Sequence, residues 1–145
     1  MTYAIFDIDG TLADCEHRRH HVASRPKNWT AFYEALDDDT PNVPVVALAQ
    51  AVASAGHKII CCSGRPSNYH KRTRLWLAKH DIPCWSLYMR EEDDHRQDFI
   101  VKREKLALIR IVHGEPLFAV DDRQQVVDMW RAEGITCFQC APGDF

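Results

Sequence analysis

The fold of this 145-residue chain is indicated first by the stretch IFDIDGTLAD, residues 5–14. Here an apolar run of the kind that forms a buried strand leads into two acidic side chains, Asp7 and Asp9, and then into a Gly-Thr pair. Two carboxylates this close repel each other unless a positive group lies between them or one of them holds a proton. The stretch therefore predicts a strand that ends at a chemically specialised site.

Further apolar segments alternate along the chain with segments of helical periodicity. The candidate strands are short, mostly rich in β-branched or aromatic residues and bounded by Gly, Pro, Ser or Asp; they span residues 3–6, 58–62, 85–89, 117–120 and 136–140. The candidate helices, in which apolar residues recur every three or four positions, span residues 45–55, 67–80, 98–112 and 123–133. This order predicts an α/β fold with a doubly wound, Rossmann-like parallel sheet of about five strands and helices on both faces.

One stretch, residues 15–43, interrupts the alternation. It is largely polar and contains a short helical segment over residues 29–36. We expect it to form a small cap-like insertion that follows the first strand and lies over the site. Because the length of the chain suits one domain, residues 1–145 are predicted to form a single domain that includes this insertion.

Composition favours a cytoplasmic protein without a membrane anchor. The chain is 46% hydrophobic and 27% charged, no apolar run approaches the ~20 residues needed to span a bilayer, and the N-terminus lacks the pattern of a secretory signal. The six cysteines form no regular framework, so we expect them to be reduced, the CFQC pair at residues 137–140 included. A net charge of −3 argues against a broad basic face for long nucleic acid but allows recognition of a chain end.

The side chains at the strand ends predict the chemistry, because ligands of open α/β sheets bind beyond the carboxyl ends of the strands. The residues predicted to meet there are Asp7, Asp9 and Thr11, then Ser63, Gly64 and Arg65, then Lys102, and finally Asp121 and Asp122. Carboxylates are preferred ligands of Mg²⁺, and a hydroxyl, a lysine and backbone N–H groups stabilise a phosphoryl group in transfer. The set predicts a Mg²⁺-dependent site in which one aspartate attacks phosphorus and another transfers protons.

Four motifs resemble those of the haloacid dehalogenase superfamily of phosphohydrolases. They are DIDGT (7–11), the strand-end Ser63, Lys102 and the pair of aspartates at 121–122. The resemblance implies that Asp7 is the nucleophile and Asp9 the general acid/base. It also implies that Ser63 and Lys102 hold the transferring phosphoryl group, and that the Mg²⁺ ligands are Asp7, the main-chain carbonyl of Asp9, Asp122 and Asp121.

A narrower resemblance is to the 3′-phosphatase domain of phage polynucleotide kinase/phosphatase. It rests on SGRP (63–66), DFIVK (98–102) and FAVDDRQQVVDMWRAEGITCFQCAPGDF (118–145), and it is weakest over the insertion. It implies that Arg18, Arg65 and Asp98 also belong to the site, with Asp98 orienting Lys102 one helical turn away. Thr11 and Gly64 are expected to bind substrate beside them. Arg19 adjoins Arg18, and either arginine could reach the site.

The implied substrate is a 3′-phosphorylated nucleic acid end or nucleotide. Two alternatives stay open: a phosphatase of free nucleotides or sugar phosphates, and an end-binding module without turnover. No G-x-x-x-x-G-K-[ST] motif occurs in the chain, so we expect no 5′-kinase activity from it and a separate kinase or ligase as partner. The start at Met1 favours a free-standing phosphatase over a piece of a larger protein.

Two clusters in the insertion allow a functional and a structural interpretation. The first comprises His17, His20 and His21, whose spacing suits zinc but whose neighbouring arginines favour a solvated basic face. The second comprises Trp29, Phe32 and Tyr33, which either stack on a nucleobase or pack the insertion onto the domain. Packing is the favoured interpretation for the aromatic cluster.

Overall fold

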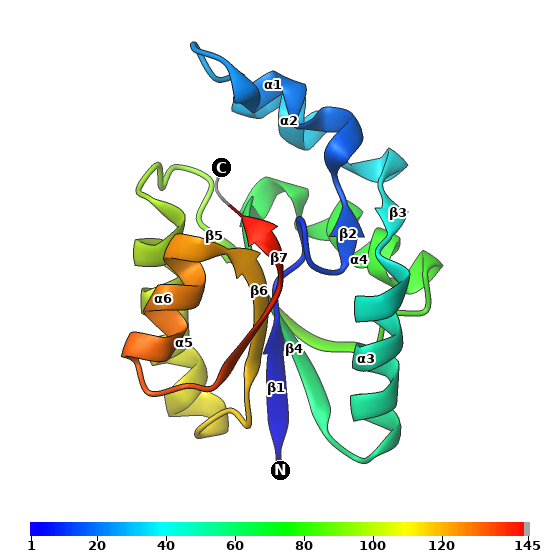
Figure 1. Ribbon diagram of the computed structural model, residues 1–145, viewed down its shortest axis with the longest axis vertical. Helices are drawn as coiled ribbons and strands as arrows, with labels where there is room; N and C mark the ends of the chain where they lie inside the picture. The colour runs from blue at the N-terminus through cyan, green and yellow to red at the C-terminus, as the bar shows by residue number, and fades with distance from the viewer. Residues whose placement is uncertain (144–145) are drawn as a thin grey trace.

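A parallel five-stranded sheet forms the centre of the fold (Figure 1). In the computed structural model, which describes residues 1–143, its strand order is β5-β4-β1-β6-β7. The strands are β1 (Tyr3–Phe6), β4 (Lys58–Pro66), β5 (Cys84–Arg90), β6 (Ala119–Arg123) and β7 (Cys137–Gly143). The central strand β1 pairs with β4 on one side, where Phe6 is opposite Cys61, and with β6 on the other, where Phe6 is opposite Val120. The predicted doubly wound parallel sheet is confirmed.

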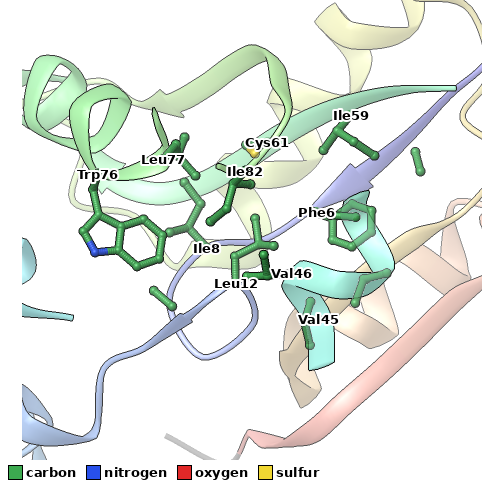
Figure 2. Close-up of a cluster of buried hydrophobic side chains, with 14 residues drawn as sticks. Phe6, Ile8, Leu12, Val45, Val46, Ile59, Cys61, Trp76, Leu77 and Ile82 are labelled. Carbon is green, nitrogen blue, oxygen red and sulfur yellow. The ribbon is translucent and has the colours of Figure 1, made fainter. Parts of the chain in front are cut away.

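Helices cover both faces of the sheet. Because successive residues of β1 point to opposite faces, this strand contributes side chains to the packing on both sides. The helices are α3 (Val43–Ser54), α4 (His70–Lys79), α5 (Asp98–His113) and α6 (Gln124–Ala132). Phe6 belongs to a buried cluster with side chains of α3 and α4, including Val46 and Trp76, as Figure 2 shows. Ile5 belongs to a second cluster with side chains of α5 and α6, including Trp130.

The strands reach further toward their carboxyl ends than the apolar runs predict. Strand β4 continues through Ser63, Gly64 and Arg65 to Pro66, and β6 continues through the two aspartates to Arg123. The extension is supported by neighbouring strands: Ser63 pairs with Met89 of β5, and Asp121 pairs with Gln139 of β7. Polar residues that resemble turn residues in the sequence are therefore held on the sheet itself.

The insertion lies beyond the carboxyl edge of the sheet, where Figure 1 shows α1 and α2. Its elements are η1 (Glu16–Arg18), α1 (His20–Ala23), α2 (Trp29–Glu34), η2 (Leu36–Asp38) and β3 (Thr40–Pro41), and β2 (Ala13–Asp14) immediately precedes it. Strands β2 and β3 pair antiparallel and bring the two ends of the insertion together. This small sheet was not predicted, because strands of two residues carry no periodicity. Helix α2 begins after Asn28, whose side chain accepts a hydrogen bond from the N–H of Ala31 and caps the helix.

All six cysteines have free thiols. Over the residues that the structure describes, no helix is both long and apolar enough to cross a membrane.

Replacing Leu106 by alanine should destabilise the fold by about 2–5 kcal/mol, because this α5 side chain is fully buried in the second cluster and its removal leaves a cavity. Leu108, two residues away in the same helix, is 46% exposed, so Leu108→Ala makes the same change in helix propensity with little loss of packing. Urea denaturation should place Leu108→Ala within about 0.5 kcal/mol of the parent protein. Equal losses for both variants would contradict this packing.

Candidate active site

A buried lysine joins two strand ends and a helix. The Nζ of Lys102, in α5, lies 2.8 Å from Asp7 Oδ1, just beyond β1, and 3.0 Å from Asp121 Oδ2, in β6. It also lies 3.7 Å from Asp98 Oδ2, one helical turn earlier. Burial by itself would lower the pKa of Lys102, but the charges of Asp121 and Asp7 raise it well above its ordinary value. Lys102 is therefore a permanent cation at the centre of the site.

Three carboxylates cluster beside this cation, and two of them, those of Asp7 and Asp121, contact it. Oxygen atoms of Asp7, Asp121 and Asp122 lie within 4.8 Å of one another, and this is the only such group of potential metal ligands among residues 1–143. Burial and the charge of Asp121 raise the pKa of Asp7 well above its ordinary value against the opposite effect of Lys102, and the same two causes raise the pKa of Asp122 to about 6. The cluster holds more negative charge than Lys102 neutralises.

One carboxylate oxygen of this cluster is open to a ligand. Asp122 Oδ2 is buried and accepts no hydrogen bond from the described part of the chain, although Arg19 Nη2 lies 3.8 Å away. By contrast, Asp121 Oδ2 already accepts hydrogen bonds from the indole N–H of Trp130 and from Lys102 Nζ. A hard divalent cation such as Mg²⁺ fits this donor set, since it prefers oxygen ligands and would neutralise the excess charge.

The glycine of DIDGT is required by its position. Gly10 has a φ of +83°, which glycine adopts without strain, and a Cβ on it would collide with the carboxylate of Asp122. The following residue, Thr11, donates a hydrogen bond of 3.0 Å from its hydroxyl to Asp7 Oδ2. The turn after β1 thus places the backbone of Gly10 next to the Asp122 carboxylate and the hydroxyl of Thr11 next to the Asp7 carboxylate.

The second aspartate of the motif, Asp9, lies in a different set of contacts. Arg65 Nη2 lies 2.6 Å and Arg18 Nη2 2.5 Å from Asp9 Oδ1, and both arginines are fully buried. Burial would raise the pKa of Asp9, but the charges of Arg65 and Arg18 outweigh it, so the pKa lies below its usual range. Arg19 instead pairs with Glu16 at 2.9 Å, so Arg18 is the arginine that contacts Asp9.

A residue that the sequence did not indicate, Asp39, completes this set. Its Oδ2 lies 2.6 Å from Arg18 Nη2 and 3.4 Å from Arg65 Nη2, and Arg18 Nε donates to its Oδ1 at 2.8 Å. Trp76 donates its indole N–H to the Asp39 carbonyl, and His17 Nε2 lies 2.6 Å from Oδ1. Asp39 is the last of three successive aspartates, a pattern typical of a solvated acidic segment. The only signal for it is indirect: two buried arginines need more than one carboxylate.

Ser63 and Gly64, near the end of β4, lie close to the first turn of α5. Ser63 is buried, and its hydroxyl accepts a hydrogen bond from the backbone N–H of Arg65 at 3.1 Å. The Cα of Gly64 faces Asp98, and a Cβ there would collide with Asp98 Oδ1. Asp98 lies 3.7 Å from each of three cations, those of Lys102, Arg90 and Arg123. Its position therefore suits orientation of Lys102.

A cavity of about 880 Å³ reaches these groups. Asp7, Asp9 and Asp122 contribute to its lining, and so do residues of α2 in the insertion and the segment of residues 90–97 opposite it. The structure thus brings every predicted site residue to the carboxyl edge of the sheet, around one cavity or directly behind its lining. The histidine cluster of the insertion forms no group of potential metal ligands among the described residues. His17 contacts Asp39, whereas His20 and His21 pack against each other with ring centroids 4.0 Å apart.

Comparisons with known proteins agree with this geometry. A family described as the phosphatase domain of polynucleotide kinase PNKP matches residues 1–145. Chains in two solved structures of a Pnkp1/Rnl/Hen1 complex, one described as an RNA repair complex, are 35% and 40% identical, with TM-scores of 0.81 and 0.82 over 99% of this chain. A protein of Autographa californica nuclear polyhedrosis virus, described as a bifunctional polynucleotide kinase/RNA ligase, is 31% identical over an alignment of 128 residues that covers 86% of this chain.

The relatives are longer than this chain. It spans 17% of the viral protein and 43% and 47% of the two repair-complex chains. The Class C acid phosphatase of Bacillus anthracis, at 14% identity with TM-scores of 0.69 and 0.73, shares the fold. The predicted resemblance is confirmed, and the match along its whole length shows that this chain belongs to the family of polynucleotide kinase phosphatase domains, with a haloacid dehalogenase-type fold.

Proposed function

We propose that this chain removes phosphate from the 3′ ends of nucleic acids by a Mg²⁺-dependent reaction that passes through a phosphoaspartate on Asp7. The observation that carries the proposal is the contrast between two buried charge clusters. The cluster around Asp9 is balanced, with two carboxylates facing two guanidinium groups. The cluster around Asp7 holds three carboxylates against the ammonium group of Lys102 and the guanidinium group of Arg19, which lies 3.8 Å from Asp122, so carboxylates are in excess.

The excess charge is what a Mg²⁺ site requires. Asp7, Asp121 and Asp122 would hold the ion, with the main-chain carbonyl of Asp9 as the further ligand that the family implies. When bound, Mg²⁺ would neutralise the carboxylates and withdraw charge from the phosphoryl oxygens. Lys102, Ser63 and the N–H groups around Gly64 would hold the remaining oxygens of the phosphate.

In the first half-reaction, a carboxylate oxygen of Asp7 attacks phosphorus and the bond from phosphorus to the 3′ oxygen breaks. The leaving oxygen takes a proton from the carboxyl group of Asp9, giving the free 3′ hydroxyl. In the second half-reaction, Asp9 takes a proton from water, whose oxygen attacks the phosphoaspartate. Inorganic phosphate leaves and the carboxylate of Asp7 is restored.

The arginines set the protonation of Asp9. With Arg18 and Arg65 against it, Asp9 starts as a carboxylate, the form that accepts a proton from water. A phosphate dianion bound nearby adds negative charge, which raises the pKa of Asp9, so Asp9 takes up a proton from solvent before the first half-reaction. It gives this proton to the leaving oxygen and regains one from the attacking water in the second half-reaction. Asp39 holds both arginines and so acts as a positioning residue for Asp9.

A 3′ end is the favoured substrate because the whole chain matches a polynucleotide phosphatase family and because the cavity is larger than a single phosphate needs. We further propose that kinase or ligase activity comes from another protein or another segment of a longer chain. Two observations support this: the sequence contains no P-loop motif, and its relatives include chains more than twice its length.

Asp7→Asn should lower phosphate release from a 3′-phosphorylated oligonucleotide at least about a thousandfold, because an amide cannot form the acyl phosphate. Thermal melting should show that the variant folds. Retained turnover would remove Asp7 from the role of nucleophile.

With the parent protein, faster hydrolysis of 5′-mononucleotides or sugar phosphates than of the 3′-phosphorylated oligonucleotide would contradict the assigned substrate. Tight binding of the 3′-phosphorylated end without turnover would indicate a binding module instead.

Removal of divalent metal with EDTA should abolish turnover, and added Mg²⁺ should restore it. Because Mg²⁺ would bind only the folded site, it should also raise the melting temperature of the parent protein, and Asp122→Asn should reduce both this shift and the affinity for Mg²⁺. A melting temperature that does not respond to Mg²⁺ would contradict the proposed ligands.

Asp39→Ala should lower the free energy of unfolding by about 3–5 kcal/mol, because it leaves buried arginines short of a carboxylate. The milder Asp39→Asn removes the charge but keeps an acceptor, and it should lower kcat while the protein stays folded. Asp38→Ala is the matched control: Asp38 is exposed, and its loss should change stability by less than about 0.5 kcal/mol. Parent-like kcat in Asp39→Asn would show that the positioning role is absent.

A further inference from the structure

The aromatic side chains of the insertion differ in what they do. Phe32 is buried, and the guanidinium carbon of Arg18 lies 4.2 Å from its ring centroid, so this ring has a structural role beneath the arginine. Tyr69, from the segment before α4, is also buried and donates its hydroxyl hydrogen to Glu34 at 2.9 Å. All three rings line the cavity that contains Asp7 and Asp9, but Trp29 is 38% exposed, whereas Phe32 and Tyr69 are buried.

Trp29 is held in a defined position although it is exposed. Its ring stacks on Tyr33 with centroids 5.9 Å apart and an interplanar angle of 24°, and it meets the edge of Phe32 at 5.6 Å. Asn28 caps the helix immediately before it. A large aromatic surface fixed in this way loses little conformational entropy when a flat ligand covers it.

Tyr33 connects this aromatic surface to the reaction centre. Its hydroxyl donates a hydrogen bond of 3.3 Å to the carbonyl of Gly64, the residue next to Ser63. Burial and the charge of Asp9 raise the pKa of Tyr33, so the hydroxyl keeps the proton that it donates. The stacked pair of Trp29 and Tyr33 therefore extends outward from the residues proposed to hold the phosphate.

We infer that Trp29, supported by Tyr33, is the stacking surface for the nucleobase of the nucleotide that carries the 3′-phosphate. The inference rests on the proposed function and narrows its substrate to a 3′-terminal nucleotide whose base has a free face, as it has in a single strand, because a base stacked between two neighbours has both faces covered. Aromatic stacking is tolerant of base identity, so the enzyme accepts any terminal base. The ammonium group of Lys27 lies 5.6 Å from the Trp29 ring centroid, where a positive charge suits the next phosphate of the strand.

The test compares 3′-phosphorylated oligonucleotides of one sequence that differ only in whether the terminal nucleotide carries its base or is abasic. For the substrate with its base, Trp29→Ala should raise KM about 5- to 150-fold, the range of base–aromatic stacking, with little change in kcat. For the abasic substrate, KM should be nearly the same in variant and parent. Trp29→Phe keeps a stacking surface and should restore most of the lost affinity.

Trp85→Ala serves as the matched control. Trp85 is a 47% exposed tryptophan in β5 that does not line the cavity, so its replacement should leave KM and kcat unchanged for both substrates. A Trp29→Ala effect of equal size on the base-bearing and abasic substrates, or no effect at all, would overturn the inference.

A binding measurement separates failure of the inference from failure of the proposed function. In the Asp7→Asn background, fluorescence anisotropy with oligonucleotides labelled at the 5′ end reports affinity without turnover. Tighter binding of the base-bearing strand that disappears in the Asp7→Asn, Trp29→Ala double variant supports stacking even if the parent protein does not hydrolyse the strand. Equal binding of both strands overturns the stacking surface even if 3′-phosphate hydrolysis is found.

Discussion

The buried ammonium group of Lys102 is the charge around which the carboxyl edge of the sheet is arranged. Asp7 follows β1 and Asp121 lies in the adjacent strand β6, and each buried side chain contacts Lys102 at about 3 Å. Without this cation, the burial of like charges at the end of β1 and β6 would cost several kcal/mol per ion. With it, Asp7 is held next to Asp122, and the remaining negative charge is available to a divalent cation.

A second ionic network connects the insertion to the sheet. Arg18 and Asp39 come from the two ends of the insertion, Arg65 comes from β4, and all three side chains are buried around Asp9. Because each guanidinium group needs the carboxylates of both Asp9 and Asp39, the insertion is positioned by the same contacts that hold Asp9. The position of Asp9 and the position of the insertion over the sheet edge therefore depend on one set of ion pairs.

Parts of the site differ in how much the sequence reveals of them. The motif DIDGT is visible because its glycine, its threonine and its two aspartates are all required locally: Gly10 by its φ and by its approach to Asp122, Thr11 by its contact with Asp7. Lys102 by itself resembles a solvated lysine. Its place in the site was indicated by Asp98, one helical turn before it, and by the family resemblance. Asp39 carried no local signal, because its partners lie 21 and 26 residues away along the chain.

The sequence by itself determined the α/β class, the parallel sheet and the set of residues at its carboxyl edge, because strand and helix periodicity and the chemistry of strand-end residues are local properties. Only the tertiary structure decided which of these residues meet. It paired Lys102 with Asp7 and Arg18 rather than Arg19 with Asp9, and it buried Phe32 beneath Arg18 while leaving Trp29 exposed in the cavity. These outcomes depend on burial and on contacts between distant segments, where the cost of an unpaired charge selects one arrangement that no local pattern encodes.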